Sequence, residues 1–118
     1  MSTFTVSAIL AHPGRRERSI VLEFLVDTGA TYTLLPEEVV TELGLPTPYE
    51  HPAELASGEQ VLYRLGEVRV GLGGQERATV FFAGPPGAQA LLGAVTLEEF
   101  GLAVDPVRQR LIPVPALL

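Results

Sequence analysis

The first two apolar stretches of the chain have the residue types of β-strands. Residues 3–10 and 19–26 are rich in β-branched and large apolar side chains, which favour extended structure. The polar segment between them, AHPGRRER, contains a Pro-Gly pair of the kind that marks a turn. We therefore expect a β-hairpin, with Arg15, Arg16 and Arg18 solvated in its turn.

The pattern changes to helical spacing after residue 35. Pro36 suits the first position of a helix, and the two glutamates that follow it suit the positive end of the helix dipole. Gly44 and Pro46 would end the helix. The apolar stripe that it would bury consists of Val39, Val40 and Leu43.

Glycine-containing turns divide the next part of the chain. Residues 53–63 have the pattern of two short extended arms around Ser57-Gly58, and Gly73-Gly74 is a strong hairpin signal. An apolar run at 90–92 follows a Pro-Gly loop. Further strands are expected at 65–72, 75–83, 102–104 and 110–114.

A second short helix is predicted to begin at Thr96. In this interpretation Glu99 completes a capping box with Thr96, and Gly101 ends the helix. Each half of the chain then contains an apolar strand, a glycine turn and a short helix, which suggests two similar halves within one domain, residues 1–118.

Composition supports a single β-rich domain and excludes several kinds of function. The chain has 118 residues, of which 47% are hydrophobic, with ten prolines and twelve glycines. It has no cysteine, which excludes disulfides, thiolate nucleophiles and cysteine-based zinc sites. His12 and His51 each lie beside a proline, so we expect both to be solvated loop residues and expect no metal or other cofactor.

Charge and hydropathy indicate which partners are absent. A net charge of -6 argues against nucleic-acid binding, which requires clustered Lys and Arg. No apolar run is long enough to span a bilayer, so we expect no membrane association. Because the first ten residues lack the features of a signal peptide, the expected compartment is the cytoplasm.

The most informative stretch is Asp27-Thr28-Gly29-Ala30, directly after the apolar residues 24–26. A carboxylate at the end of a buried strand is costly unless it is paired or hydrogen-bonded. Gly29 lets backbone N–H groups approach that carboxylate closely, and Thr28 adds a hydroxyl that both donates and accepts. Asp-Thr-Gly is also ordinary turn chemistry, and from the residues alone that alternative stays open.

These four residues between apolar flanks resemble the active-site signature of aspartic proteases. A single copy in so short a chain resembles the retroviral-type, or retropepsin-like, branch. Leu91-Leu92-Gly93 and the helix after it resemble the family's hydrophobic-hydrophobic-Gly strand and helix, and residues 55–63 occupy the place of its flap hairpin. The resemblance extends from Phe4 to Leu111. It assigns Leu55, Ala56, Ser57, Gly58 and Glu59 to the flap, and Leu91, Leu92 and Gly93 to a loop beside the site.

The resemblance implies a mainly β fold, a closed acid-protease β-barrel half with one or two short helices and a flap hairpin. It also implies an aspartic endopeptidase acting on peptides or unfolded proteins. Because peptide hydrolysis by carboxyl groups needs two of them, Asp27 would face its own copy across the two-fold axis of a homodimer. Thr28 would hydrogen-bond across that axis, and Gly29 would aim its backbone at the carboxylate. Ala30 would keep the approach to that carboxylate narrow.

Two departures from the family pattern concern the dimer. Many viral members carry a charged pair at the positions of Thr31 and Ala94, and interleave their chain ends in a sheet that Pro113 and Pro115 would interrupt here. A catalytically silent dimerisation or peptide-binding module is therefore the alternative function. A metal-dependent hydrolase is remote, because no histidine or second acid lies at ligand spacing from Asp27. The apolar residues predicted to line the substrate pocket are Val26, Leu55, Val61, Val80 and Leu91.

Overall fold

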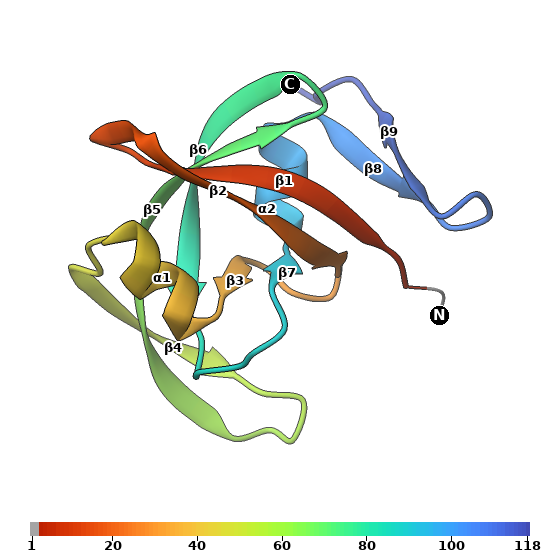
Figure 1. Ribbon diagram of the computed structural model, residues 1–118. Helices are drawn as coiled ribbons and strands as arrows, with labels where there is room; N and C mark the ends of the chain where they lie inside the picture. Colours follow the sequence, from red (N-terminus) through yellow and green to blue (C-terminus); the bar gives the residue numbers. More distant parts are fainter. Residues whose placement is uncertain (1–2) are drawn as a thin grey trace.

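The computed structural model describes residues 3–118, which form a mainly β fold with two short helices (Figure 1). The strands are β1 (Thr5–His12), β2 (Arg15–Val26), β3 (Thr33–Leu35), β4 (Tyr49–Glu54), β5 (Gln60–Leu72), β6 (Gln75–Ala83), β7 (Leu91–Leu92), β8 (Leu102–Asp105) and β9 (Arg110–Pro113). The helices are α1 (Glu37–Leu43) and α2 (Ala94–Glu99). This architecture confirms the predicted mainly β class with one or two short helices.

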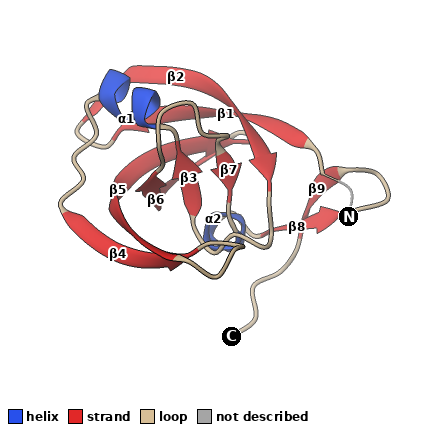
Figure 2. Cartoon of the chain, turned by 90° about the horizontal axis from the view of Figure 1, so that it is seen from below, coloured by secondary structure: helices blue, strands red, loops and turns tan. Residues whose placement is uncertain are grey.

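The sheet topology brings the loop after β2 close to the loop after β7. Seven strands pair in the order β1-β2-β7-β3-β6-β5-β4, and β8 pairs with β9 separately. β1 also pairs with β5, so strands far apart in that order are joined. β7 pairs parallel with β2 and antiparallel with β3. The loop after β2 therefore lies beside the loop after β7, as the view from below shows (Figure 2).

The three predicted hairpins are present, but the first has a much tighter turn than expected. β1 and β2 remain paired as far as His12 and Arg15. Consequently Arg15, Arg16 and Arg18 lie in β2 rather than in a turn, although they are exposed as predicted. Two of them reach acidic or carbonyl groups of neighbouring elements, Arg16 to the carboxylate of Glu76 and Arg18 to the carbonyl oxygen of Glu42.

The prediction that both histidines lie in loops is wrong. His12 ends β1, and its Nδ1 accepts a hydrogen bond from the N–H of Gly14 at 2.9 Å. His51 lies in β4 opposite Tyr63 of β5. β4 is at the end of the strand order, and an edge strand tolerates Pro52 because its outer N–H groups have no partner in the sheet.

Helix α1 is close to the prediction, while α2 begins differently. α1 starts directly after Pro36 and ends at Leu43, with Gly44 as its C-cap. α2 starts at Ala94, so Thr96 lies inside the helix and caps nothing. The predicted capping box with Glu99 is therefore wrong. The first N–H groups of α2 are satisfied instead by backbone carbonyls of a loop far away in sequence, described below.

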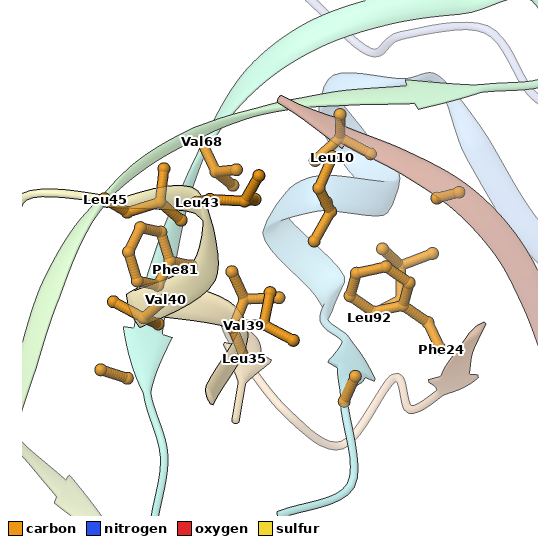
Figure 3. Packing of buried hydrophobic residues seen from close by; sticks show 14 of the residues in the cluster. Leu10, Phe24, Leu35, Val39, Val40, Leu43, Leu45, Val68, Phe81 and Leu92 are labelled. Atoms are coloured by element: carbon orange, nitrogen blue, oxygen red, sulfur yellow. The ribbon is translucent and has the colours of Figure 1, made fainter. Parts of the chain in front are cut away.

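A cluster of buried apolar side chains packs the sheet against both short helices (Figure 3). Helix α1 contributes Val39, Val40 and Leu43, which confirms its predicted apolar stripe. Phe24 of β2 and Leu92 of β7 are fully buried. Burying a side chain of that size contributes about 1.5–3 kcal/mol. The two strands that lead into the candidate site are thus anchored in the core immediately before it.

Candidate active site

Asp27 directly follows β2 and begins a loop that we call the active-site loop, residues 27–32. Its N–H donates to the carbonyl of Leu92 at 3.1 Å, and its own carbonyl accepts from the N–H of Ala30 at 3.2 Å. The side-chain Oδ1 accepts from the N–H of Gly29 at 3.0 Å. Asp27 therefore makes the local turn that its sequence suggested, and that turn also fixes one oxygen of the carboxylate.

The active-site loop is also bonded to the start of α2. The N–H of Ala94 donates to the carbonyl of Ala30 at 2.8 Å, and the N–H of Val95 donates to that of Thr31 at 2.9 Å. Thr31 and Ala94 are the positions where the charged pair of many viral members is missing. In this chain backbone hydrogen bonds connect the two segments at that place.

Gly93 permits this close approach. A Cβ at Gly93 would lie 2.4 Å from the backbone carbon of Tyr32 and 2.5 Å from its carbonyl oxygen. Real atoms do not pack so closely, so this position admits only glycine. Of its neighbours in β7, Leu92 is buried in the core and Leu91 reaches the cleft described next.

A cleft of about 720 Å³ lies between the active-site loop and the β4–β5 hairpin, with β3, β6 and β7 contributing to its wall. Asp27, Gly29 and Ala30 line it at one side, and Leu55 and Ala56 at the other. The remaining lining residues are Thr31, Tyr32, Leu34, His51, Pro52, Ala53, Glu54, Tyr63, Phe82 and Leu91.

The flap tip, residues 55–59, turns the chain from β4 into β5. The N–H of Leu55 donates to the carbonyl of Glu59, and that of Gly58 donates to the carbonyl of Leu55, each at 2.8 Å. The N–H of Glu59 donates to Ser57 Oγ at 3.3 Å. Ser57, Gly58 and Glu59 are exposed and do not line the cleft. In Figure 1 this hairpin projects from the sheet on the side of the active-site loop.

Aromatic rings form one wall of the cleft, and sequence reasoning missed them. Tyr32 stacks on Phe82 with ring centroids 5.0 Å apart. Tyr63 and His51 approach the same phenyl ring at 6.2 and 6.3 Å. The rings come from the active-site loop, β6, β5 and β4. The only sequence signal for this wall was the alternation of side chains in β5, which places Tyr63 and Leu65 on one face of the strand.

Of the five apolar residues predicted to line a substrate pocket, two line this cleft. Leu55 and Leu91 line the cleft, whereas Val26, Val61 and Val80 do not. Val26 is buried in the core, because its side chain points to the face of β2 that also carries Phe24.

Thr28 and Gly29 lie on the exposed side of the active-site loop. The hydroxyl of Thr28 makes no hydrogen bond to another residue in the range 3–118. Both residues are thus accessible to a second chain.

Two acids, Asp27 and Glu54, are among the residues that line the cleft. Within residues 3–118, no group of three or more His, Cys, Asp or Glu side chains is arranged to hold a metal ion. In the same part of the chain, no helix has the length and apolar character needed to cross a membrane.

Known proteins share this sequence pattern and this fold. Residues 18–99 match the family described as gag-polyprotein putative aspartyl protease. The EIAV protease complexed with the inhibitor HBY-793 superposes with a TM-score of 0.62 at 17% identity, over 88% of this chain and 93% of that one. The retroviral protease-like domain of Ddi1 from Leishmania major gives 0.64 at 12% identity, over 96% of this chain and 89% of that one.

No curated protein matches the sequence. The two structural likenesses, at such low identity, establish the fold. The family match covers residues 18–99, more than half of the chain, and includes the active-site loop, the flap tip and Gly93. The protein therefore belongs to the gag-polyprotein putative aspartyl protease family and has the retropepsin-like fold of aspartic proteases.

Proposed function

We propose that this protein is an aspartic endopeptidase, active as a homodimer in which Asp27 and the partner subunit's Asp27 form the catalytic pair. The observation that carries the proposal is the position of Asp27. It lies on a loop whose N–H at Asp27 donates to the carbonyl of Leu92 and whose carbonyl at Ala30 accepts from the N–H of Ala94. Asp27 also lines a cleft that a hairpin closes on the other side.

The chemistry requires a second carboxyl group. One ionised carboxylate takes a proton from water, while a protonated one donates to the oxygen of the scissile carbonyl. The resulting tetrahedral intermediate collapses when the amine leaves with a proton. Two carboxylates a few ångströms apart do not readily both ionise, so a facing pair shares one proton. Glu54, the other acid of the cleft, lies on the opposite wall in β4 and lacks a comparable glycine-rich loop.

A symmetric dimer supplies that second carboxyl group most directly. A two-fold axis beside the active-site loop would bring the exposed Thr28 and Gly29 of two copies together. The free hydroxyl of Thr28 is suited to a hydrogen bond across the axis. An extended peptide would then bind along the cleft, with the flap hairpin adding main-chain hydrogen bonds to it.

The aromatic wall points to the kind of side chain that the cleft accepts. Tyr32, Tyr63 and Phe82 offer flat apolar faces, and aromatic or large aliphatic groups gain most from packing against such faces. We therefore expect cleavage near large hydrophobic residues in unfolded or flexible protein segments.

The test is cleavage of an unfolded protein and a mixed peptide library by the wild type and by Asp27→Asn, from acid to neutral pH. Loss of general acid–base chemistry should lower the rate by about 10²–10⁴-fold in the variant. Sedimentation of both proteins checks the dimer, and a melting curve confirms that each is folded. Cleavage that persists unchanged in Asp27→Asn, or activity in a strictly monomeric sample, would contradict the proposal.

The alternative is a silent dimerisation or peptide-binding module. The uncharged Thr31 and Ala94 and the two prolines near the chain end are the features that favour it. A folded wild type that binds peptides in the same assay but cleaves none at any pH would identify that function instead.

A further inference from the structure

Three buried threonines and one glutamate form a continuous chain of hydrogen bonds behind the active-site loop. Thr33 Oγ1 lies 2.7 Å from Thr96 Oγ1, which lies 2.8 Å from Thr79 Oγ1. Thr79 in turn donates to Glu99 Oε1 at 2.7 Å. At the other end, the N–H of Gly93 donates to Thr33 Oγ1 at 3.2 Å. The three hydroxyl groups are almost completely buried, with at most 2% of each residue exposed.

The groups at the two ends of this hydrogen-bond series, the Gly93 N–H and the Glu99 carboxylate, fix which hydroxyl donates to which. A backbone N–H only donates, and an ionised carboxylate only accepts. Because Thr79 gives its one proton to Glu99, it must accept from Thr96. By the same reasoning Thr96 accepts from Thr33, and Thr33 accepts from Gly93. Every hydroxyl then donates once and accepts once, which leaves no buried donor unsatisfied.

This series of hydrogen bonds ends at Gly93, in the segment that holds the active-site loop. Gly93 has Leu92 on one side, whose carbonyl accepts from the N–H of Asp27, and Ala94 on the other, whose N–H donates to Ala30. Gly93 itself lies against the backbone of Tyr32. A shift of the Gly93 peptide would therefore move two hydrogen bonds of the active-site loop.

We propose that Glu99 is a positioning residue, whose carboxylate orients the hydroxyls of Thr79, Thr96 and Thr33 and so holds the Gly93 peptide against the active-site loop. Glu99 lies at the end of α2 with its residue exposed, yet its Oε1 is the terminal acceptor of a buried network. The positioning effect stands on the geometry alone, and its effect on catalysis rests on the proposed protease function.

Removing the Glu99 carboxylate should disturb the hydrogen bonds at Gly93. In Glu99→Leu, either Thr79 keeps a proton without an acceptor or the chain reverses and Thr33 does. In both cases a buried hydroxyl loses a bond, and the network loses the charge that polarises it. Glu99→Gln keeps an acceptor oxygen in the same place without the charge, so this variant should behave largely like the wild type.

The neighbouring Glu98→Leu is the matched control. Glu98 is also exposed near the end of α2, and within residues 3–118 its side chain makes no hydrogen bond or ion pair. The change in charge, helix and side-chain size is the same as in Glu99→Leu. A melting curve for each variant confirms that it is folded.

The experiment measures amide hydrogen exchange and NMR chemical shifts of Gly93, Ala94 and Asp27 in the wild type and the three variants. In Glu99→Leu the exchange of these amides should be about tenfold faster and their signals displaced, with recovery in Glu99→Gln and no change in Glu98→Leu. Unchanged amides in Glu99→Leu, or equal changes in Glu98→Leu, would overturn the proposal.

Peptide cleavage by the same variants separates the two proposals. The Glu99→Leu variant should lose about tenfold in kcat with little change in KM, because Glu99 does not line the cleft and makes no contact with substrate. If the wild type cleaves nothing, the protease function fails while the amide measurements still decide the role of Glu99. If kcat is unchanged although the amides shift, Glu99 holds the loop without positioning it for catalysis, and that part of the proposal fails.

Discussion

The active-site loop and the flap tip line opposite sides of one cleft, but they are held in different ways. The active-site loop is bonded to β7 and α2, segments more than sixty residues away along the chain. The hydrogen bonds that shape the flap tip run between Leu55, Ser57, Gly58 and Glu59, all within the tip itself. A loop fixed by distant buried segments cannot move without disturbing the core, whereas a tip bonded only to itself can open and close with its hairpin.

The two glycines of these regions show the same contrast. Gly93 has ordinary dihedral angles, but a Cβ there would meet backbone atoms at 2.4–2.9 Å. Gly58 has no heavy atom within 4 Å of its hypothetical Cβ, but its φ is +88°. The first glycine is required by packing, and the second by the geometry of a turn in open solvent.

Substituting alanine at each glycine tests this contrast and should give the largest effect. Gly93→Ala forces backbone atoms apart, so we expect a loss of about 3 kcal/mol or more in unfolding free energy, or failure to fold. Gly58→Ala should cost only about 1 kcal/mol, because it strains one residue with positive φ. Denaturant unfolding measures both, and equal losses in the two variants would show that the regions are held alike.

Hydrogen exchange sharpens the comparison without any mutation. The amides of Asp27 and Ala94 donate to carbonyls across the sheet and loop, while the amide of Gly58 closes only a local turn. We expect the first two to exchange at least about 10²-fold more slowly than Gly58, since they open only when the surrounding strands separate. Similar protection at all three sites would mean that the flap tip is as rigid as the active-site loop.

A change on the cleft wall should have a moderate effect on function. Tyr32→Ala removes the ring stacked on Phe82, and each such aromatic contact contributes about 0.5–1.5 kcal/mol. We expect KM to rise up to about tenfold for peptides with an aromatic side chain and much less for peptides without one. Tyr49→Ala is the control, because Tyr49 is an exposed tyrosine at the start of β4 that does not line the cleft. Equal effects of the two changes would argue against a substrate role for the aromatic wall.

The smallest effect is expected away from both regions, at Glu76 of β6. A hydrogen bond from Arg69, assisted by the charge of Arg16, holds the pKa of Glu76 below its usual 4.5, although partial desolvation opposes this. A lowered pKa in the folded state means that the ionised carboxylate stabilises the fold above pH 4.5, and that this stabilisation is lost as the pH falls through the lowered value.

Glu76→Gln should therefore lower the melting temperature by about 1–2 °C at neutral pH, because exposed ion pairs contribute little. At a pH low enough to protonate Glu76 in the folded wild type, the two proteins should melt at the same temperature. Melting curves at both pH values measure this. A difference that persists in acid would show that the carboxylate acts through something other than its charge.

Much of the fold followed from local sequence. Stretches of β-branched and large apolar residues on either side of turn signals predicted the hairpins, Gly73-Gly74 marked a turn, and the spacing of Val39, Val40 and Leu43 predicted α1. These features depend on interactions between residues close in the chain, so a single sequence contains their signal. The start of α2 was misplaced because Thr96 satisfies distant threonines rather than its own helix.

The candidate site divides in the same way. The sequence by itself marked Asp27-Thr28-Gly29-Ala30 as a turn-forming motif after an apolar strand, and the family resemblance of its motifs assigned the flap tip and Leu91-Leu92-Gly93. Only the tertiary structure decided that β7 would pair beside β2, that four aromatic rings from separate elements would share one wall, and that Glu99 would end a buried chain reaching Gly93. Those contacts join residues up to sixty-six positions apart, as in the pairing of Leu25 with Leu91, and they depend on how strands pair and pack rather than on any local pattern.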